Sequence, residues 1–513
     1  MVVNKAAKRL VEKRDFIHIT ILLLIALGIG IYLITTTVLI AKDGVFYIER
    51  AQKFSSDPIG IIKVHPPGYP FLIFIAHKSV TLFSNRASLQ TWIYSAQSVT
   101  LLCRLLAIIP LYFIGKLLVG SRKSFCAVLI LMILPHSAKY CGEVLREWPY
   151  ILFLAGGFLF LLWGAKHGKW WAFGLVGLCA GLGYLIRHES TQIVVYGLIW
   201  LTLCMFRPKP CCVSRWKILI ALALLLIGFA IPAVPYMKCT GQSINPKVKY
   251  IMKSFSFHTL PDRTDASTVN IVAPNFNYNA AEVVSPNVLE ALSEIFKTIG
   301  ENLMWFFMLP LVIGLYYRLR GNAKFEEQFL ITVFVLANVT MMVLQHCYCT
   351  PGISRRWSLS LIALIIFYVP VGLQVLGDWL SSRFYKSQGE NKENPQLWFF
   401  ILLVVGVAIC LPKLFRPIGI DKNGYKKASK WLNENTVEDA IVAVPDKRIS
   451  FYAERKGLIY DKKVPKRAKY IVEIVKDENE RLRFAMAVQE KYSGWVDKRK
   501  ERGKRLVIYK VMQ

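Results

Sequence analysis

Long apolar runs without charged residues limit this chain to very few folds. The first run covers residues 16–40. A transmembrane α-helix needs about 20 apolar residues to cross a hydrocarbon core of about 30 Å. Hydrophobic residues make up 54% of the chain, and only 19% are charged, against about 25% in a soluble protein. We therefore expect a polytopic α-helical membrane protein.

Ten further runs have the composition of membrane-spanning helices. We expect about 11 transmembrane helices in total, within a range of 11–13. The run at residues 124–134 is short for a span. The ten runs cover residues 88–118, 124–134, 148–165, 170–186, 191–205, 216–236, 303–317, 329–344, 357–376 and 397–411.

The positions of the basic residues predict the orientation. Lys and Arg gather in alternate loops, as the positive-inside rule requires of cytoplasmic loops. With the amino terminus in the cytoplasm and an odd number of spans, residues 412–513 lie outside, as do the loops at 42–87 and 238–302. Basic residues in the expected cytoplasmic loops include Lys116, Arg122, Lys123, Lys166, Lys169, Arg207, Lys209, Arg215, Lys217, Arg318, Arg320, Lys324, Arg383, Lys386 and Lys392.

The net charge of +31 would suggest a nucleic-acid partner in a soluble protein. Here the basic residues flank apolar runs, where anionic lipid head groups attract them. We therefore expect membrane lipids as partners, and no nucleic acid.

The chain divides into two expected domains. Residues 1–411 form the transmembrane module, and residues 412–513 form a small extracytoplasmic α/β domain. In the second domain, the apolar spacing predicts a helix at 425–435 and strands at 440–444, 469–475 and 505–511.

Asp43 lies directly after the first span. Val45, Ile48 and Ala51 follow it at helical spacing, which predicts an amphipathic helix in the membrane interface that begins near Asp43. We expect a second interfacial helix at residues 71–83. Ionisable side chains at this depth are costly and mark functional sites. Asp43 is therefore a candidate catalytic residue, and a solvated loop carboxylate or a helix cap is the plainer alternative.

A basic corner follows in the same loop, with the sequence His65-Pro-Pro-Gly-Tyr-Pro. Its prolines fix φ and turn the chain sharply. Lys63 and His65 stand beside these prolines and suit a phosphate, and Asp43 with His65 is a candidate pair of metal ligands. A lysine that reaches toward water and a turn histidine are the ordinary alternative.

Three further charged clusters fall on the expected outer side. Glu143 and Glu147 are four residues apart and would share one helical face. Arg187 ends a glycine-rich turn, and Arg355 and Arg356 precede a late span. Guanidinium groups match phosphate oxygens in a bidentate geometry, so these arginines are candidate phosphate ligands. Each cluster alone is explained by ordinary anchoring of charged residues at the membrane interface. A functional site is favoured only because all the clusters fall on the same side of the membrane.

The 11 cysteines show no CxxC pair and no zinc-ligand spacing. Cys239, Cys347 and Cys349 fall on the expected outer side. A disulfide among these three is an open expectation, with no pairing assigned.

Five motifs, in this order along the chain, resemble those of the GT-C glycosyltransferases. The branch with the greatest similarity is that of the bacterial protein O-mannosyltransferases and aminoarabinose transferases. The resemblance covers roughly residues 16–380, and the last hundred residues resemble the periplasmic domain of some members. The motifs are Asp43 after the first span, His-Pro-Pro-x-Tyr-Pro at 65–70, Gly-Glu-x-x-x-Glu-x-Pro at 142–149, Gly-Leu-x-Tyr-Leu-x-Arg at 181–187 and Arg-Arg-Trp at 355–357.

The resemblance implies a GT-C fold and a glycosyltransferase of the bacterial inner membrane. Such an enzyme moves a sugar from a polyprenyl-phosphate donor, with inversion, to a hydroxyl of a glycan, lipid or protein acceptor outside the cytoplasm. Asp43 matches the first-loop carboxylate that acts as general base, and Glu147 or Glu143 matches the second acidic position. Lys63 or His65 matches the basic residue that contacts the lipid phosphate.

Some relatives in the family bind a divalent metal near the first loop. Val64 stands where an acidic residue would favour such a metal. The cofactor expectation therefore stays open between none and a divalent metal.

Three other functions remain as alternatives. A lipid-linked glycan transporter or flippase would place charged or broken helices near the membrane midplane, whereas the polar residues here gather at one face. An O-antigen ligase-type enzyme would take its sugar from a lipid pyrophosphate. A non-catalytic membrane scaffold would keep its function after Asp43→Asn.

Overall fold

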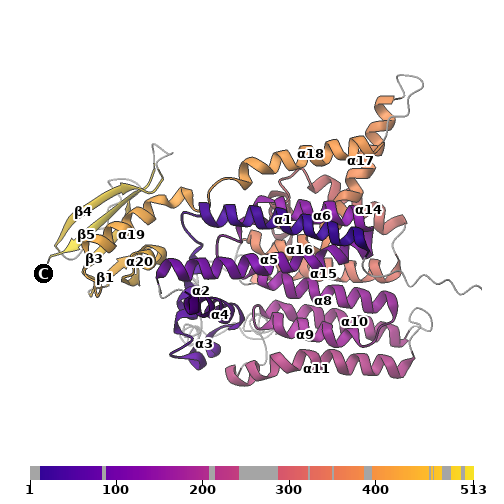
Figure 1. Cartoon of the computed structure of the whole chain (residues 1–513), viewed down its shortest axis with the longest axis horizontal. Coiled ribbons are helices and arrows are strands. Elements are labelled where there is room, and N and C mark those ends of the chain that lie inside the picture. Colours follow the sequence, from indigo (N-terminus) through magenta and orange to yellow (C-terminus); the bar gives the residue numbers. More distant parts are fainter. Residues whose placement is uncertain are drawn as a thin grey trace, which may run out of the picture.

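Most of the chain folds into a bundle of long helices, with a small sheet domain beyond one end of the bundle (Figure 1). The helices of the bundle come first along the chain, and the strands of the sheet come last, in the order that the sequence predicts. The computed structural model describes residues 12–83, 88–206, 214–241, 287–321, 324–348, 352–385, 395–460, 464–465, 467–475, 487–497 and 503–512.

Among these described residues, eight helical stretches are long and apolar enough to cross a membrane. The other three of the eleven predicted runs contain shorter helices, α6 (Ser121–Ile133), α9 (Ala172–Tyr184) and α14 (Met308–Gly321). At 1.5 Å per residue, the 13 residues of α6 reach about 20 Å, which is less than the thickness of a membrane core. The predicted count of 11 spans is therefore not confirmed.

The eight long stretches form the body of the bundle. One of them combines α16 and α17 through a 3-10 turn, and another begins with the 3-10 turn η1. Their bounds are α1 (Lys13–Thr36), α5 (Leu89–Val119), α8 (Glu147–His167), η1 (His188–Ser190) with α10 (Thr191–Phe206), α11 (Arg215–Thr240), α15 (Phe325–Tyr348), α16 (Arg355–Ile365), η4 (Ile366–Tyr368) with α17 (Val369–Tyr385), and α18 (Pro395–Leu414).

Short helices gather at one end of this body. The two helices expected in the first loop are present as α2 and α4, and α3 between them is an addition to the expectation (Figure 1). The predicted apolar side of α2 is buried through Val45, Ile48 and Ala51. The bounds of the short helices are α2 (Lys42–Lys53), α3 (Pro58–Val64), α4 (Gly68–Phe83), α7 (Pro135–Lys139) and α13 (Val288–Asn302).

The last part of the chain forms a five-stranded sheet in the order β2-β1-β3-β5-β4. Strand β1 is parallel to β2 and β3, and β5 is antiparallel to β3 and β4. The three expected strands are present. The sequence did not predict β2 and β4, because most of their residues are exposed and so lack the apolar pattern of a buried strand. The division at residues 411 and 412 stays a prediction. The bounds are η5 (Ile420–Lys422), α19 (Asn423–Asn435), β1 (Ile441–Val444), α20 (Lys447–Tyr452), β2 (Lys456–Ile459), β3 (Tyr470–Val475), β4 (Val488–Trp495) and β5 (Arg505–Val511).

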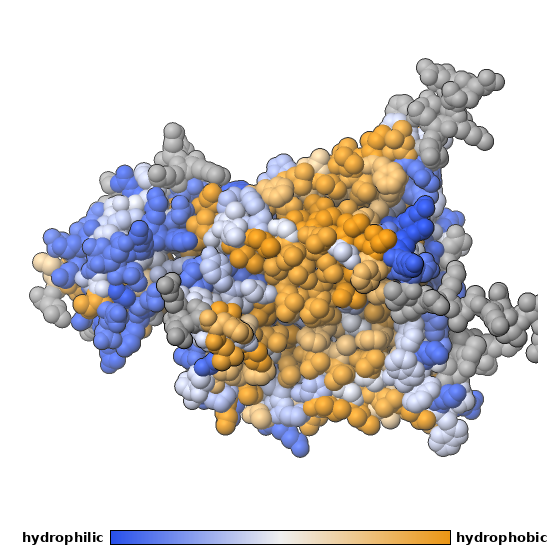
Figure 2. All heavy atoms as spheres, viewed as in Figure 1, coloured by the Kyte–Doolittle hydropathy of each residue, from blue (hydrophilic) through white to orange (hydrophobic). Residues whose placement is uncertain are grey.

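An apolar flank covers the side of the bundle that Figure 2 shows, and polar surface bounds this flank at both ends. Large apolar side chains lie exposed on the outer helices, among them Leu24, Ile227 and Val404. A continuous exposed apolar surface of this extent marks contact with a membrane. The chain is therefore an integral membrane protein.

The described cysteines give one clear answer about disulfides. Cys239 and Cys347 are both free thiols, so no disulfide joins them. Cys349, the third cysteine of that expectation, lies outside the described residues.

Candidate active site at one end of the bundle

Asp43 occupies the first turn of α2, where the helix is pressed against the turn before α8. The amide of Ala41 donates to the carbonyl oxygen of Glu143 at 3.2 Å. A Cβ atom on Gly44 would lie 2.8 Å from the same oxygen, so only glycine permits this approach. The Asp43 carboxylate remains about half exposed, at 48%. The fold therefore presents Asp43 to solvent from a firmly packed helix end.

Glu143 and Glu147 do not share a helical face, so this prediction is wrong. Glu143 lies in a turn, Val144 has a left-handed backbone with φ of 58°, and α8 begins at Glu147. Pro149 is the physical reason, because its ring would clash with the carbonyl of Leu145 in a helix that began earlier. Burial raises the pKa of the partly buried Glu143 carboxyl to about 7.

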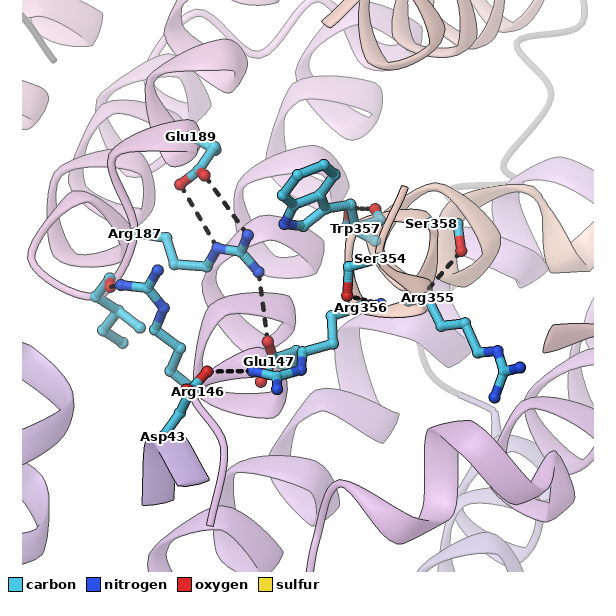
Figure 3. Close-up of polar contacts among 12 residues, drawn as sticks. Asp43, Arg146, Glu147, Arg187, Glu189, Ser354, Arg355, Arg356, Trp357 and Ser358 are labelled. Atoms are coloured by element: carbon cyan, nitrogen blue, oxygen red, sulfur yellow. Dashed lines mark hydrogen bonds and ion pairs between the residues drawn. The ribbon is translucent and has the colours of Figure 1, made fainter. Parts of the chain in front are cut away.

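Two arginines meet these carboxylates from distant parts of the chain (Figure 3). Arg356, at the start of α16, forms an ion pair and hydrogen bond with Asp43. Arg187 lies 3.7 Å from Glu147 and 3.5 Å from Glu189, measured between side-chain nitrogen and oxygen. Burial alone would lower the pKa of Arg187, but the carboxylates of Glu189 and Glu147 raise it above its usual range.

Arg355 points away from this group, although it is the neighbour of Arg356 (Figure 3). Its guanidinium pairs with Glu301 at 2.6 Å, and the side-chain amide of Asn302 donates to its backbone carbonyl at 2.9 Å. Successive residues of an α-helix point about 100° apart, so two adjacent arginines cannot reach the same partner. Of the predicted arginine pair, only Arg356 joins the group around Asp43.

The basic corner is held against the turn that precedes Arg187. The amide of Gly68 donates to the carbonyl oxygen of Leu185 at 2.8 Å, and a Cβ at Gly68 would lie 2.8 Å from that oxygen. The imidazole ring of His65 lies 5.2 Å from the ring of Phe46 on α2. Lys63 is exposed, and it makes no ion pair or hydrogen bond with any described residue. Of the two predicted alternatives, His65 is the one that faces α2.

Several basic side chains act on His65. Burial, together with the charges of Arg50, Arg146 and His188, lowers the pKa of His65 to about 4, so its imidazole is neutral near pH 7. Burial also lowers the pKa of Arg50 to about 10. Arg50 lies over the ring of Phe46 at 3.7 Å. We call Arg50, His65, Arg146 and His188 the His65 group; an anion among them would relieve the repulsion between the charges of Arg50 and Arg146.

Arg50 was missed as a site residue, although a signal was present. It follows Asp43 by seven residues, which is two helical turns, so both side chains lie on the same side of α2. Arg146, which stands between the two glutamates in the sequence, is a further basic residue of this group. Its guanidinium donates to the carbonyl of Ile186 at 3.3 Å, which ties the turn before α8 to the turn before Arg187.

The candidate metal ligands Asp43 and His65 do not belong to a larger cluster of ligand side chains. In the described part of the chain, no three His, Cys, Asp or Glu side chains gather as a metal would require. Asp43 is paired with Arg356, and the positive charges of Arg50 and Arg146 act on His65, so both positions oppose a divalent cation. We therefore assign no step to a metal.

A family model and several solved structures are similar to this chain. Residues 64–234 match the model of the dolichyl-phosphate-mannose-protein mannosyltransferase family. This stretch contains His65, Glu143, Glu147 and Arg187, but it stops before α16 and begins after Asp43. No curated protein matches the chain.

Solved structures share the fold over most of the chain. ArnT from Cupriavidus metallidurans, bound to undecaprenyl phosphate, is 13% identical, with a TM-score of 0.57 over 97% of this chain and 98% of its own. The oligosaccharyltransferase of Archaeoglobus fulgidus in its apo form is 13% identical, with a TM-score of 0.51 over 90% of this chain and 70% of its own. The archaeal oligosaccharyltransferase AglB from the same organism was solved with an inhibitory peptide and a dolichol-phosphate. It is 14% identical, with a TM-score of 0.52 over 90% of this chain and 69% of its own.

These identities show the fold alone, whereas the family model adds a sequence match over a third of the chain. The expected GT-C fold, with its small carboxy-terminal sheet domain, is confirmed. The family model and the shared fold agree with the resemblance drawn from the sequence motifs: the chain has the GT-C fold, and over residues 64–234 its sequence is similar to a family of membrane glycosyltransferases.

Proposed function

We propose that the protein transfers a sugar from a polyprenyl-phosphate carrier to an acceptor hydroxyl, with inversion at the sugar carbon and with Asp43 as general base. The observation that carries this proposal is the convergence of two carboxylates and two arginines at one end of the bundle. Asp43, Glu147, Arg187 and Arg356 come from four separate segments of the sequence (Figure 3). Carboxylates accept protons, and guanidinium groups stabilise a leaving phosphate, so the two residue types match the two halves of the reaction.

Asp43 must exchange its partner before it can act as a base. Both members of its pair with Arg356 are partly exposed, at 48% and 33%. An ion pair in such a place is worth about 0–1 kcal/mol, so an incoming phosphate can attract Arg356 at little cost. The freed carboxylate then takes the proton of the acceptor hydroxyl as the hydroxyl oxygen attacks the sugar carbon and the bond to phosphate breaks.

We assign the donor phosphate to the space between Arg356 and the His65 group. The neutral imidazole of His65 can donate one N–H to a phosphate oxygen, and Arg50 and Arg146 supply positive charge. Negative charge grows on the phosphate as the sugar leaves, and cations held in place for it lower the barrier. Glu147 holds Arg187 in position through their ion pair. The carboxyl of Glu143 interacts electrostatically with Arg356, so its ionisation changes the net charge beside that arginine.

Two relatives support a lipid-linked donor. ArnT was solved with undecaprenyl phosphate, and AglB with dolichol-phosphate and an inhibitory peptide. We place the reaction at the extracytoplasmic face of a bacterial inner membrane, with the amino terminus in the cytoplasm and the sheet domain outside. This orientation follows from the basic loops of the sequence. The acceptor is a glycan, lipid or protein hydroxyl.

The test compares Asp43→Asn with Asp57→Asn in purified membranes supplied with radiolabelled polyprenyl-phosphate sugars. Asp57 belongs to the same loop, and its carboxylate accepts the amide of Gly60 at 2.9 Å, a capping role that asparagine also fills. We expect Asp43→Asn to lower label transfer by about 10²–10⁴-fold and Asp57→Asn to leave it unchanged. Equal label transfer by wild type and Asp43→Asn would refute the role of Asp43 as general base.

A further inference from the structure

The segment that joins α1 to the helix of Asp43 takes its hydrogen bonds from the end of the chain. Residues 37–41 are not helical: the backbone is extended at Thr37 and Ala41 and bends at residues 38 and 39. The amide of Val38 donates to the carbonyl oxygen of Ile418 at 2.9 Å, and the amide of Ile40 donates to the hydroxyl oxygen of Tyr452 at 3.1 Å. Both partners lie beyond the last span, so the sheet domain fixes the path of the chain into α2.

Leu39 strengthens this connection, because its side chain belongs to the core of the sheet domain. It is 1% exposed and packs in the cluster that includes Tyr425, Leu432 and Ile508. Gly419 makes the close approach possible, since it has a left-handed backbone with φ of 74° and a Cβ there would lie 2.6 Å from the Leu39 carbonyl oxygen. The first loop is thus inserted into the sheet domain three residues before α2 begins.

Helix α20 holds the same region at two further points, and it lies beside α2 in Figure 1. Lys447 forms an ion pair with Glu49, in the middle of α2. The buried guanidinium of Arg448 is fixed by Asp446 at 2.6 Å and reaches the carbonyl oxygen of Ile40 at 3.5 Å. The backbone amide and carbonyl of Ile40 are therefore both bound by α20.

We propose that the sheet domain positions Asp43, with Tyr452, Arg448 and Lys447 as its positioning residues. The proposal rests on the role of Asp43 as general base. A non-helical linker alone leaves a helix many orientations, whereas a catalytic group must be held within about 0.5 Å of its working position. Bonds to the linker and to the middle of α2 remove this freedom from both sides.

The test uses two tyrosines of the same domain. Tyr452→Phe removes the hydroxyl that binds Ile40, and Tyr460→Phe removes a buried hydroxyl that donates to the carbonyl of Val472 at 2.7 Å inside the domain. A displacement of about 1 Å can lower a rate by about 100-fold, so we expect a smaller shift to lower kcat by about tenfold in Tyr452→Phe. The KM for the donor should stay unchanged, and Tyr460→Phe should keep the wild-type kcat.

Hydrogen–deuterium exchange provides a readout that does not depend on activity. We expect amides in residues 38–53 to exchange faster in Tyr452→Phe and at the wild-type rate in Tyr460→Phe. The proposal is overturned if both variants keep the wild-type kcat, or if exchange at 38–53 is the same in both. A wild-type protein that transfers no sugar would refute the proposed function instead, and the exchange comparison would still decide whether the domain holds this segment.

Discussion

Glu143 should make the folded protein less stable as the pH rises, and Glu143→Gln should remove this effect. The pKa of this carboxyl is about 7 in the folded chain, against an ordinary value of 4.5. Between these two pH values the unfolded chain releases a proton that the folded chain keeps. The free energy of unfolding therefore falls by about 1.4 kcal/mol per pH unit, or about 3 kcal/mol in total, and then stays level above pH 7.

A glutamine has no proton to lose, so the variant should gain stability relative to wild type over the same pH interval. Thermal unfolding in detergent from pH 4.5 to pH 8.5 measures this as a difference in Tm that grows by a few degrees and then levels off. Glu434→Gln is the matched control, because its side chain is 58% exposed on α19. A Tm difference between wild type and Glu143→Gln that stays constant across this range would refute the reasoning.

Three further predictions follow from the positions of side chains. Arg356→Ala should lower sugar transfer by about 100-fold, whereas Arg355→Ala should not, and equal losses in a transfer assay would contradict the assignment. His65→Gln should raise the KM for the donor by about tenfold while Lys63→Gln leaves it unchanged, with the opposite order counting against the His65 group. A cysteine placed on the exposed side of residues 423–434 should react with an impermeant thiol reagent in intact cells, and protection there would reverse the proposed orientation.

The helices of the bundle were predictable because their signal is local. An apolar run long enough to cross a membrane predicts a helix whatever it packs against. Asp43, His65, Glu147 and Arg187 were candidates from the sequence because ionisable residues at span ends stand out, and their roles in a site stay a prediction. The number of spans was less predictable, because α6, α9 and α14 are apolar but short, and composition alone does not say whether a short helix crosses.

The finer arrangement depended on contacts that no local pattern reports. The spacing of Glu143 and Glu147 fits a helix, but Pro149 delays the helix until the second glutamate. The choice between Arg355 and Arg356 depends on the rotation of α16 about its axis. The contact between Ile40 and Tyr452 joins residues 412 positions apart, and neither residue carries a sequence signal for the other.

The contact between Ile40 and Tyr452 also limits when the first loop can reach its final structure during synthesis of the chain. Leu39 leaves the ribosome early, but the core that encloses it is made of residues near the end of the chain. At synthesis rates of about 5–20 residues per second, roughly 20–80 s pass before Tyr452 exists to bind Ile40. During this time α2 lacks these bonds. A chain that ends before the sheet domain therefore lacks both the hydrogen bond to Ile40 and the core that encloses Leu39, the two contacts next to the helix of Asp43.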